Sequence, residues 1–158
     1  MHRTQNPTAP AADTDNPAVV TPADTLRGAA RYLEVHGWTQ NVYYGGNPGD
    51  AFPPACADGA IGMAAYGRVT GCPGREKQDP GYRDYNRACD YFGGYLRQIG
   101  YRPPCDPWCP GDPDCLCDND EIEVVFVWND DPQCIKQDVV RALNAAADDY
   151  ERTHGGTR

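Results

Sequence analysis

The sequence is poor in positive charge and contains no long hydrophobic run. Lysine and arginine together number 14 against 23 aspartates and glutamates, so the formal net charge is −9. Phosphate backbones and anionic lipid surfaces attract basic proteins, and this charge balance argues against direct binding to either of them. No segment approaches the roughly 18 consecutive apolar residues that a membrane-spanning helix needs. We therefore expect neither a nucleic-acid nor a membrane partner.

Motifs that would name a reaction are also absent. The sequence contains no Gly-rich phosphate loop, no G-x-S-x-G turn and no H-E-x-x-H motif. Residues 1–20 lack the apolar stretch of a secretory signal and are rich in Pro, Thr, Ala and Asp. We therefore predict a disordered leader over residues 1–20 and a cytoplasmic protein.

Glycine and proline are abundant, at 17 and 15 residues, so much of the chain should form turns and loops. Short segments with helical patterning lie between these loops. We predict a mainly α protein, a small bundle of three to four helices with one or two short strands and a Cys-rich loop insertion. A single domain should cover residues 21–151, with the insertion at residues 103–120 and a flexible tail at residues 152–158.

The first two helices are indicated by residues typical of helix ends. Thr21 is a good N-cap, Pro22 suits the first helical position and Gly37 is a natural stop, which together predict a helix over residues 22–36. A second helix is predicted over residues 56–66. Its many alanines and glycines favour close packing against a neighbour.

Two later helices are indicated by apolar stripes at helical spacing. The stripe of the third helix comprises Tyr85, Cys89, Phe92, Leu96 and Ile99, and Gly100 ends it. The last helix is predicted to begin with Asp131 as N-cap and Pro132 at the first position. Its core stripe comprises Ile135, Val139, Leu143, Ala146 and Tyr150.

Two segments favour strands. Residues 41–44 form a short run between loops. Residues 122–128 are almost entirely β-branched or aromatic, which is typical of a buried strand. We therefore predict a minor β element beside the helices.

Three short motifs mark the ends of predicted elements. They are His36-Gly37-Trp38-Thr39-Gln40, Cys56-Ala57-Asp58-Gly59-Ala60 and Trp128-Asn129-Asp130. Together they resemble an uncharacterised family of small domains from actinobacteria and their phages, whose members typically show Gly-Trp-Cys-Gln, Cys-x-x-Gly-Ala-Leu and Trp-Asn-Asp. Thr39 stands where that family commonly has a cysteine. The resemblance covers about residues 21–151 apart from the loop 105–117, and it implies a small bacterial or phage cytoplasmic domain without an established activity.

Four cysteines lie within thirteen residues: Cys105, Cys109, Cys115 and Cys117. Four thiolates can enclose a tetrahedral structural zinc ion, the one cofactor that we predict. Because the spacing differs from the paired C-x2-C knuckles of common zinc sites, two local disulfides or four free thiols stay open as alternatives. With zinc or with disulfides, the cysteines would staple a polar, Pro-rich loop.

The same region is strongly acidic, with nine acids and no base between Arg102 and Lys136. The simplest interpretation is a solvated acidic face, and a functional one is attraction to a basic protein partner. Five of these acids match positions 1, 3, 7, 9 and 12 of a calcium loop. Leu116 however occupies a ligand position and Cys117 replaces the glycine of the sharp turn, so we do not predict calcium binding.

Cys56 opens the second predicted helix, where the helix dipole favours a thiolate. A cysteine nucleophile also needs a nearby base, and His36 is the one histidine placed to approach it. The competing interpretation treats Cys56 and Cys89 as small core residues, and we favour it. A small cysteine-dependent enzyme using Cys56 with His36 as base is thus the alternative function.

The turn at Trp128, Asn129 and Asp130 is the remaining candidate binding site, because loops at the ends of elements often carry ligands. In the simpler interpretation Trp128 is a core residue, and the side chains of Asn129 and Asp130 form hydrogen bonds with the backbone. The third helix also carries four tyrosines, for which one interpretation is an exposed aromatic face and the other, which explains most of them, is core packing: Tyr82, Tyr85, Tyr91 and Tyr95. We therefore expect a non-enzymatic accessory or interaction protein, of phage or actinobacterial origin, that binds a host or cellular protein through an acidic, aromatic surface.

Overall fold

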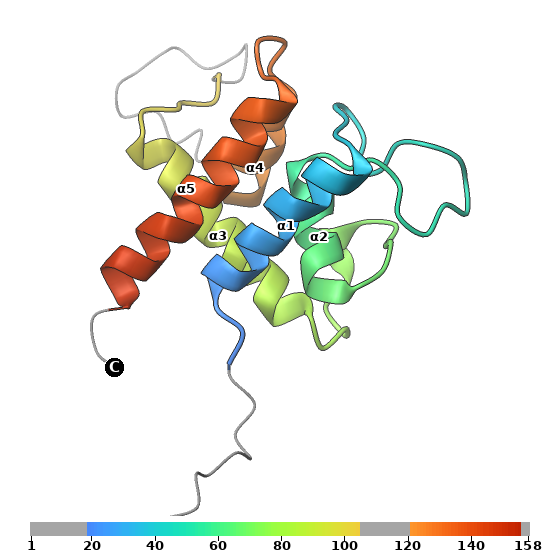
Figure 1. Ribbon diagram of the computed structural model, residues 1–158, viewed down its shortest axis with the longest axis horizontal. Coiled ribbons are helices and arrows are strands. Elements are labelled where there is room, and N and C mark those ends of the chain that lie inside the picture. The colour runs from blue at the N-terminus through green and yellow to red at the C-terminus, as the bar shows by residue number, and fades with distance from the viewer. Residues whose placement is uncertain (1–18, 105–120, 156–158) are drawn as a thin grey trace, which may run out of the picture.

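The computed structural model describes residues 19–104 and 121–155, which form helices joined by loops (Figure 1). The helices are α1 (Pro22–His36), α2 (Ala57–Tyr66), α3 (Tyr82–Gln98), α4 (Glu121–Asn129) and α5 (Lys136–His154), with a short 3-10 turn η1 (Pro73–Arg75). The predicted mainly α class is confirmed, although these residues contain five α-helices and no strand. None of the described helices has both the length and the apolar character of a membrane span.

Helix α1 is the central element of the bundle. It lies between α5 and α2 and also packs against α3 (Figure 1). Its buried face is built mainly from alanine and leucine, which lets the neighbouring helices approach closely. The largest fully buried side chains around it come from the other helices: Ile61, Tyr85, Phe92, Leu96, Val124, Val125, Val139 and Leu143.

Both predicted ends of α1 are confirmed. The Thr21 side chain accepts a hydrogen bond from the Asp24 backbone N–H, and the Asp24 carboxylate accepts one from the Thr21 backbone N–H at 2.8 Å. This reciprocal capping box satisfies two donors that a helix start leaves open. Gly37 follows the helix with a φ of 98° and donates its N–H to the Leu33 carbonyl. Glycine suits that conformation because it lacks a Cβ.

The strand predicted over residues 122–128 is wrong, because this segment belongs to helix α4. Its consecutive residues Val124 and Val125 are both fully buried. Successive side chains of a strand point to opposite faces, whereas those of a helix are about 100° apart and can both enter one core. Helix α4 packs against α3 and α2, and its backbone satisfies its own hydrogen bonds without a partner strand. A short apolar run does not distinguish these two structures by pattern.

The strand predicted over residues 41–44 is also wrong. Asn41 has a φ of 65°, which breaks an extended backbone at the first of these residues. Tyr44 forms only an isolated antiparallel bridge with Ala55, and Trp38 forms an isolated parallel one with the same residue. The segment is therefore a loop that is closed by a few backbone contacts.

Helix α5 begins later than predicted and ends later as well. Asp131 does not cap it; the Asp131 carboxylate accepts from the Gln133 N–H at 2.8 Å and closes a local turn. Ile135 is the residue before the helix, and it is 52% exposed instead of buried. The helix continues to His154, so residues 152–154 of the predicted tail are helical. Residues 1–18, 105–120 and 156–158 lie outside the described residues, and with them most of the predicted leader and insertion.

Gly59 of α2 provides a test of this packing. A Cβ atom there would lie 2.2 Å from the carbonyl oxygen of Tyr43, which is backbone and cannot easily move away. We expect Gly59→Ala to lower the free energy of unfolding by about 1–3 kcal/mol, measured by urea denaturation.

Gly94→Ala is the matched control, because Gly94 also lies in a helix and a Cβ there meets no atom within 4 Å. The control should stabilise the protein by about 0.5–1 kcal/mol through helix propensity. Equal effects of the two substitutions would contradict the close approach of the 41–44 loop to α2.

Candidate functional site

The three sequence motifs meet at the side chain of Asn129, the last residue of α4. This side chain is fully buried. Its Oδ1 accepts from Trp38 Nε1 at 2.7 Å and from the Ala57 backbone N–H at 2.9 Å. Its Nδ2 donates to the Thr39 carbonyl at 3.2 Å and to Asp130 Oδ1 at 2.8 Å. One amide group therefore joins the end of α1, the start of α2 and the end of α4.

Two further contacts extend this Asn129 junction to the chain after α4. Gln40 Nε2 donates to the carbonyl oxygens of Asn129 and Asp131, at 2.8 and 2.9 Å. The Asn41 backbone N–H donates to Asp130 Oδ1 at 2.8 Å. The turn is thus held in place by the segment that follows α1.

The predicted binding residues Trp128, Asn129 and Asp130 therefore take internal contacts. Both the oxygen and the nitrogen of the Asn129 amide form hydrogen bonds within the protein. The ring of Trp128 lies edge-on against that of Phe92, with centroids 5.6 Å apart. This arrangement supports the interpretation of the motif as a structural turn. The turn also positions the chain that follows it, from Asp131 onward.

A second polar group, which the sequence did not point out, surrounds Asp58 in the first turn of α2. Asp58 is buried and accepts a hydrogen bond from the Tyr85 hydroxyl at 2.6 Å. The Cys89 thiol donates to the same oxygen at 3.8 Å. Burial, and after it the charge of Asp58, raises the pKa of Cys89 well above its ordinary value. Tyr85 and Cys89 were found as core positions, but periodicity does not indicate which buried acid they face.

Cys56 has the environment of a core thiol. It is fully buried at the N-cap of α2, where its sulfur accepts from the Gly59 N–H at 3.3 Å. Burial, and next the charge of Asp58, raises the pKa of Cys56 to about 12. At neutral pH the thiol is therefore protonated, which is the wrong state for a nucleophile.

His36, the predicted base for Cys56, packs among rings at the end of α1. Its ring lies 4.6 Å from that of Tyr32 and 5.2 Å from that of Phe52, centroid to centroid. No hydrogen bond joins His36 to Cys56 in the part of the chain that the structure describes. The geometry thus favours the interpretation of Cys56 as a core residue over a Cys56–His36 pair.

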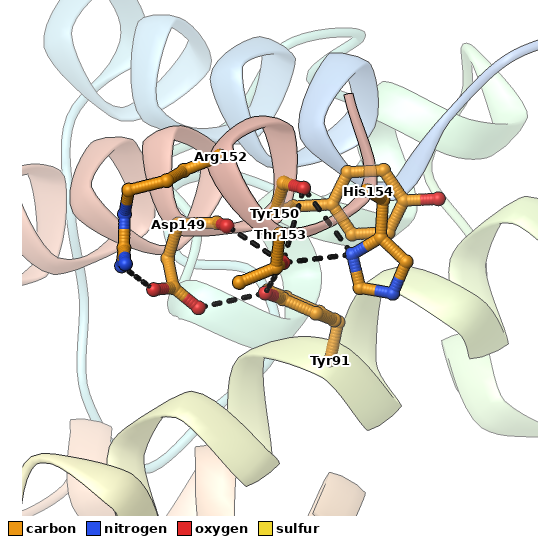
Figure 2. Close-up of polar contacts among 6 residues, drawn as sticks. All are labelled: Tyr91, Asp149, Tyr150, Arg152, Thr153 and His154. Carbon is orange, nitrogen blue, oxygen red and sulfur yellow. Dashed lines mark hydrogen bonds and ion pairs between the residues drawn. The ribbon is translucent and has the colours of Figure 1, made fainter. Parts of the chain in front are cut away.

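A third polar cluster ties the end of α5 to α3 (Figure 2). The Tyr91 hydroxyl donates to Asp149 Oδ2 at 2.7 Å and lies 3.2 Å from the Thr153 hydroxyl. Asp149 also pairs with Arg152. The His154 ring stacks on Tyr150 with centroids 4.3 Å apart, and its Nδ1 lies 2.8 Å from Thr153 Oγ1.

These contacts suit a structural role for the cluster in Figure 2. The buried carboxylate of Asp149 has its hydroxyl donor on α3 and its cation on the next turn of α5. Burial, and among the charges that of Asp149, raises the pKa of Tyr91, so the hydroxyl stays a donor. The hydrogen bonds from Tyr91 to Asp149 and Thr153 thus fasten the last turn of α5 to α3.

An open pocket of about 260 Å³ lies where the chain passes from α4 to α5. We call it the α4–α5 pocket, and its lining residues are Tyr101, Trp128, Asp131, Gln133, Cys134 and Asp138. Two aromatic rings and two carboxylates therefore share one opening. The sequence showed this stretch as acidic, but it did not indicate that Tyr101, which follows α3, would meet it.

The predicted zinc ligands Cys105, Cys109, Cys115 and Cys117 lie outside the described residues, and the zinc site stays a prediction. Among the described residues the free cysteines are Cys56, Cys72, Cys89 and Cys134.

Residues 17–149 match the model of a family of unknown function, DUF6197. The chain belongs to this family. The match spans most of the chain, as the motif resemblance implied, and it includes all of the Asn129 junction and the α4–α5 pocket. Neither the curated proteins nor the solved structures contain a match to the chain.

Asn129→Ala tests the central role of the junction. The substitution leaves Trp38 Nε1 and the Ala57 N–H without their acceptor in a buried site. We expect a loss of roughly 3 kcal/mol in the free energy of unfolding, measured by urea denaturation.

Asn86→Ala is the control for this experiment, since the side-chain hydrogen bond of Asn86 among the described residues is an exposed one to Asp90 of the same helix. It should change stability by less than about 0.5 kcal/mol. A stable Asn129→Ala protein would show that the junction does not hold the three helix ends together.

The raised pKa of Cys56 predicts alkaline destabilisation. Folding raises this pKa from an ordinary 9.0 to about 12, so the folded state holds the proton more tightly. The resulting stabilisation is complete below pH 9 and is lost as pH rises towards 12. Cys56→Ser keeps an N-cap acceptor but does not titrate in this range, and it should make the loss of stability between pH 9 and 11 shallower. Parallel pH profiles of the two proteins, from chemical denaturation, would contradict the assignment.

Proposed function

We propose that this protein is a non-enzymatic interaction protein that binds a basic segment of another protein through its acidic, aromatic surface at the α4–α5 pocket. The observation that carries the proposal is the pocket itself, which brings Asp131 and Asp138 together with Tyr101 and Trp128. Such a surface attracts positive charge through its carboxylates and buries apolar area through its rings.

The charge around the pocket supports a basic partner. Lys136 is the one basic residue among residues 121–138, and its Nζ donates to the Glu34 carbonyl on α1 at 3.3 Å. The acids Asp130, Asp131 and Asp138 lie in the same stretch. A net charge of −9 adds a long-range field that steers basic proteins towards the molecule.

Two exposed apolar side chains are close in sequence to residues that line the pocket. Ile99 is 57% exposed and comes two residues before Tyr101, and Ile135 is 52% exposed and follows Cys134. Protein interfaces commonly combine aromatic and aliphatic contact area with a polar rim. The combination of these residues with two carboxylates favours a protein over a small anionic ligand.

The cysteine-enzyme alternative has weaker support. It requires a thiolate at Cys56, whereas burial keeps that thiol protonated, and it requires a base that His36 does not supply in this arrangement. The motif similarity further favours an actinobacterial or phage origin, with the partner in the cytoplasm of the cell or of the phage host. Direct binding to nucleic acid or membrane is not part of the proposal, given the charge of −9.

Binding of a labelled basic peptide tests the proposal. The probe is a flexible twelve-residue peptide of Arg, Lys, Gly and Ser, and its neutral counterpart has Gln at each basic position. We expect the 158-residue protein to bind the basic peptide and not its neutral counterpart, as measured by fluorescence anisotropy. The affinity should fall by about tenfold or more between low and moderately high salt, because exposed charges are screened.

Two double variants locate the binding surface. Asp131→Asn with Asp138→Asn removes two charges at the pocket. Asp148→Asn with Glu151→Gln removes two charges elsewhere on α5, where both acids pair with Arg27. The pocket variant should lose most of the affinity and the control variant little of it. Equal losses would indicate a general effect of net charge and would contradict the assigned surface.

A further inference from the structure

We infer that the α4–α5 pocket is a receptor for a single arginine side chain. This inference deepens the proposed function. It rests on that function for the source of the arginine, which would belong to the basic segment of the bound protein.

The Asp131 carboxylate is held in place before any ligand arrives. Its Oδ1 accepts from the Gln133 N–H at 2.8 Å, and its backbone carbonyl accepts from Gln40 Nε2 and from the Cys134 N–H, both at 2.9 Å. The turn is therefore fixed at the side chain and at the backbone. A preorganised acceptor loses little conformational entropy when a cation binds.

The Asp138 carboxylate is the second acid that lines the opening. It lies in the first turn of α5 and forms an ion pair with Arg141 at 3.2 Å. The side chains of that pair are 42% and 76% exposed, and such exposed pairs contribute little stability. An incoming guanidinium can share the Asp138 carboxylate with Arg141, or it can take the place of Arg141.

Tyr101 and Trp128 supply aromatic walls. Trp128 is fixed by its edge-on contact with Phe92, and Tyr101 is anchored by its backbone N–H, which donates to the Leu96 carbonyl at 2.9 Å. A cation near the face of a Trp or Tyr ring is attracted by the ring quadrupole. Rings and carboxylates together thus favour a flat cation.

The field in the pocket is negative. Burial, and next the charges of Asp138 and Asp131, raises the pKa of Cys134 to about 11, so its thiol is neutral and does not attract anions. The pKa of Tyr101 is raised as well, by burial and then by the charge of Asp131. The two carboxylates that line the pocket, Asp131 and Asp138, would repel an anionic ligand.

Arginine fits these features better than lysine. Its guanidinium is planar, stacks on aromatic rings and presents five N–H donors in a fork, so it can reach two carboxylates from one position. Lysine offers a compact and strongly hydrated charge that gains less from the rings. We therefore assign the pocket to arginine.

The test is a titration of the full-length protein with three small probes, followed through the indole N–H resonance of Trp128 by NMR. The probes are arginine, lysine and citrulline, each capped at both ends. Trp128→Phe assigns the resonance. We expect capped arginine to shift it in a saturable way, capped lysine to bind several-fold more weakly, and capped citrulline, which has the shape of arginine without its charge, to give no shift.

Variants of the two acids complete the experiment. Asp131→Asn keeps the acceptor for the Gln133 N–H, so the turn should fold, and Asp138→Asn serves if it does not. Each substitution should weaken the affinity for capped arginine by about five- to tenfold. Asp148→Asn, remote from the pocket and paired with Arg27, should leave it unchanged. Equal binding of arginine and citrulline, or no effect of either pocket variant, would overturn the assignment.

The outcome separates this inference from the proposed function. If the twelve-residue basic peptide binds but capped arginine does not, the pocket is not an arginine receptor and the wider proposal stands. If capped arginine binds but the basic peptide does not, the pocket stands and the proposal of a basic protein partner falls.

Discussion

The architecture depends on one buried amide group, the side chain of Asn129. An amide inside a protein is costly unless its donor and acceptor atoms are both paired. Here Oδ1 and Nδ2 take partners from the indole of Trp38, the start of α2 and the loop after α1. Since these partners come from two separate parts of the chain, the loop after α1 and the start of α2, the cost of burying the amide is offset only when both are in place. The junction therefore selects a single arrangement of three helix ends.

Helix α4 needs this constraint more than its neighbours do. It has nine residues, too few for a helix to be stable alone in water, and its apolar side chains are not confined to one face. Burial of Val124 and Val125 provides its stability, but burial alone does not fix where such a helix ends. The bonds to Asn129 fix that end, and the direction in which the chain continues to Asp131 follows from it.

Local signals in the sequence predicted the parts of the fold that local physics decides. The cap at Thr21 and the stop at Gly37 are interactions between residues a few positions apart, and both were readable. Residues 122–128 were predicted as a strand because β-branched residues are typical of strands. The prediction failed because tertiary packing overrides this local preference and stabilises a helix. The Asn129 junction joins residues that are 72 to 91 positions apart, and no periodicity reports such contacts. The motif was visible, but its use as an internal support was not.

The chemistry of the candidate site was predictable, but its geometry was not, because the geometry again depends on contacts between distant parts of the chain. Acidity between Arg102 and Lys136 was plain, yet the pocket also requires Tyr101, which α3 brings to the turn. Gln40 connects the two regions, because its amide donates both to the junction at Asn129 and to the carbonyl of Asp131. A ligand that holds the turn at Asp131 would therefore also favour the arrangement in which Gln40 and Asn129 are paired. Binding at the pocket and stability of the junction are thus expected to be linked, each raising the other through the same turn.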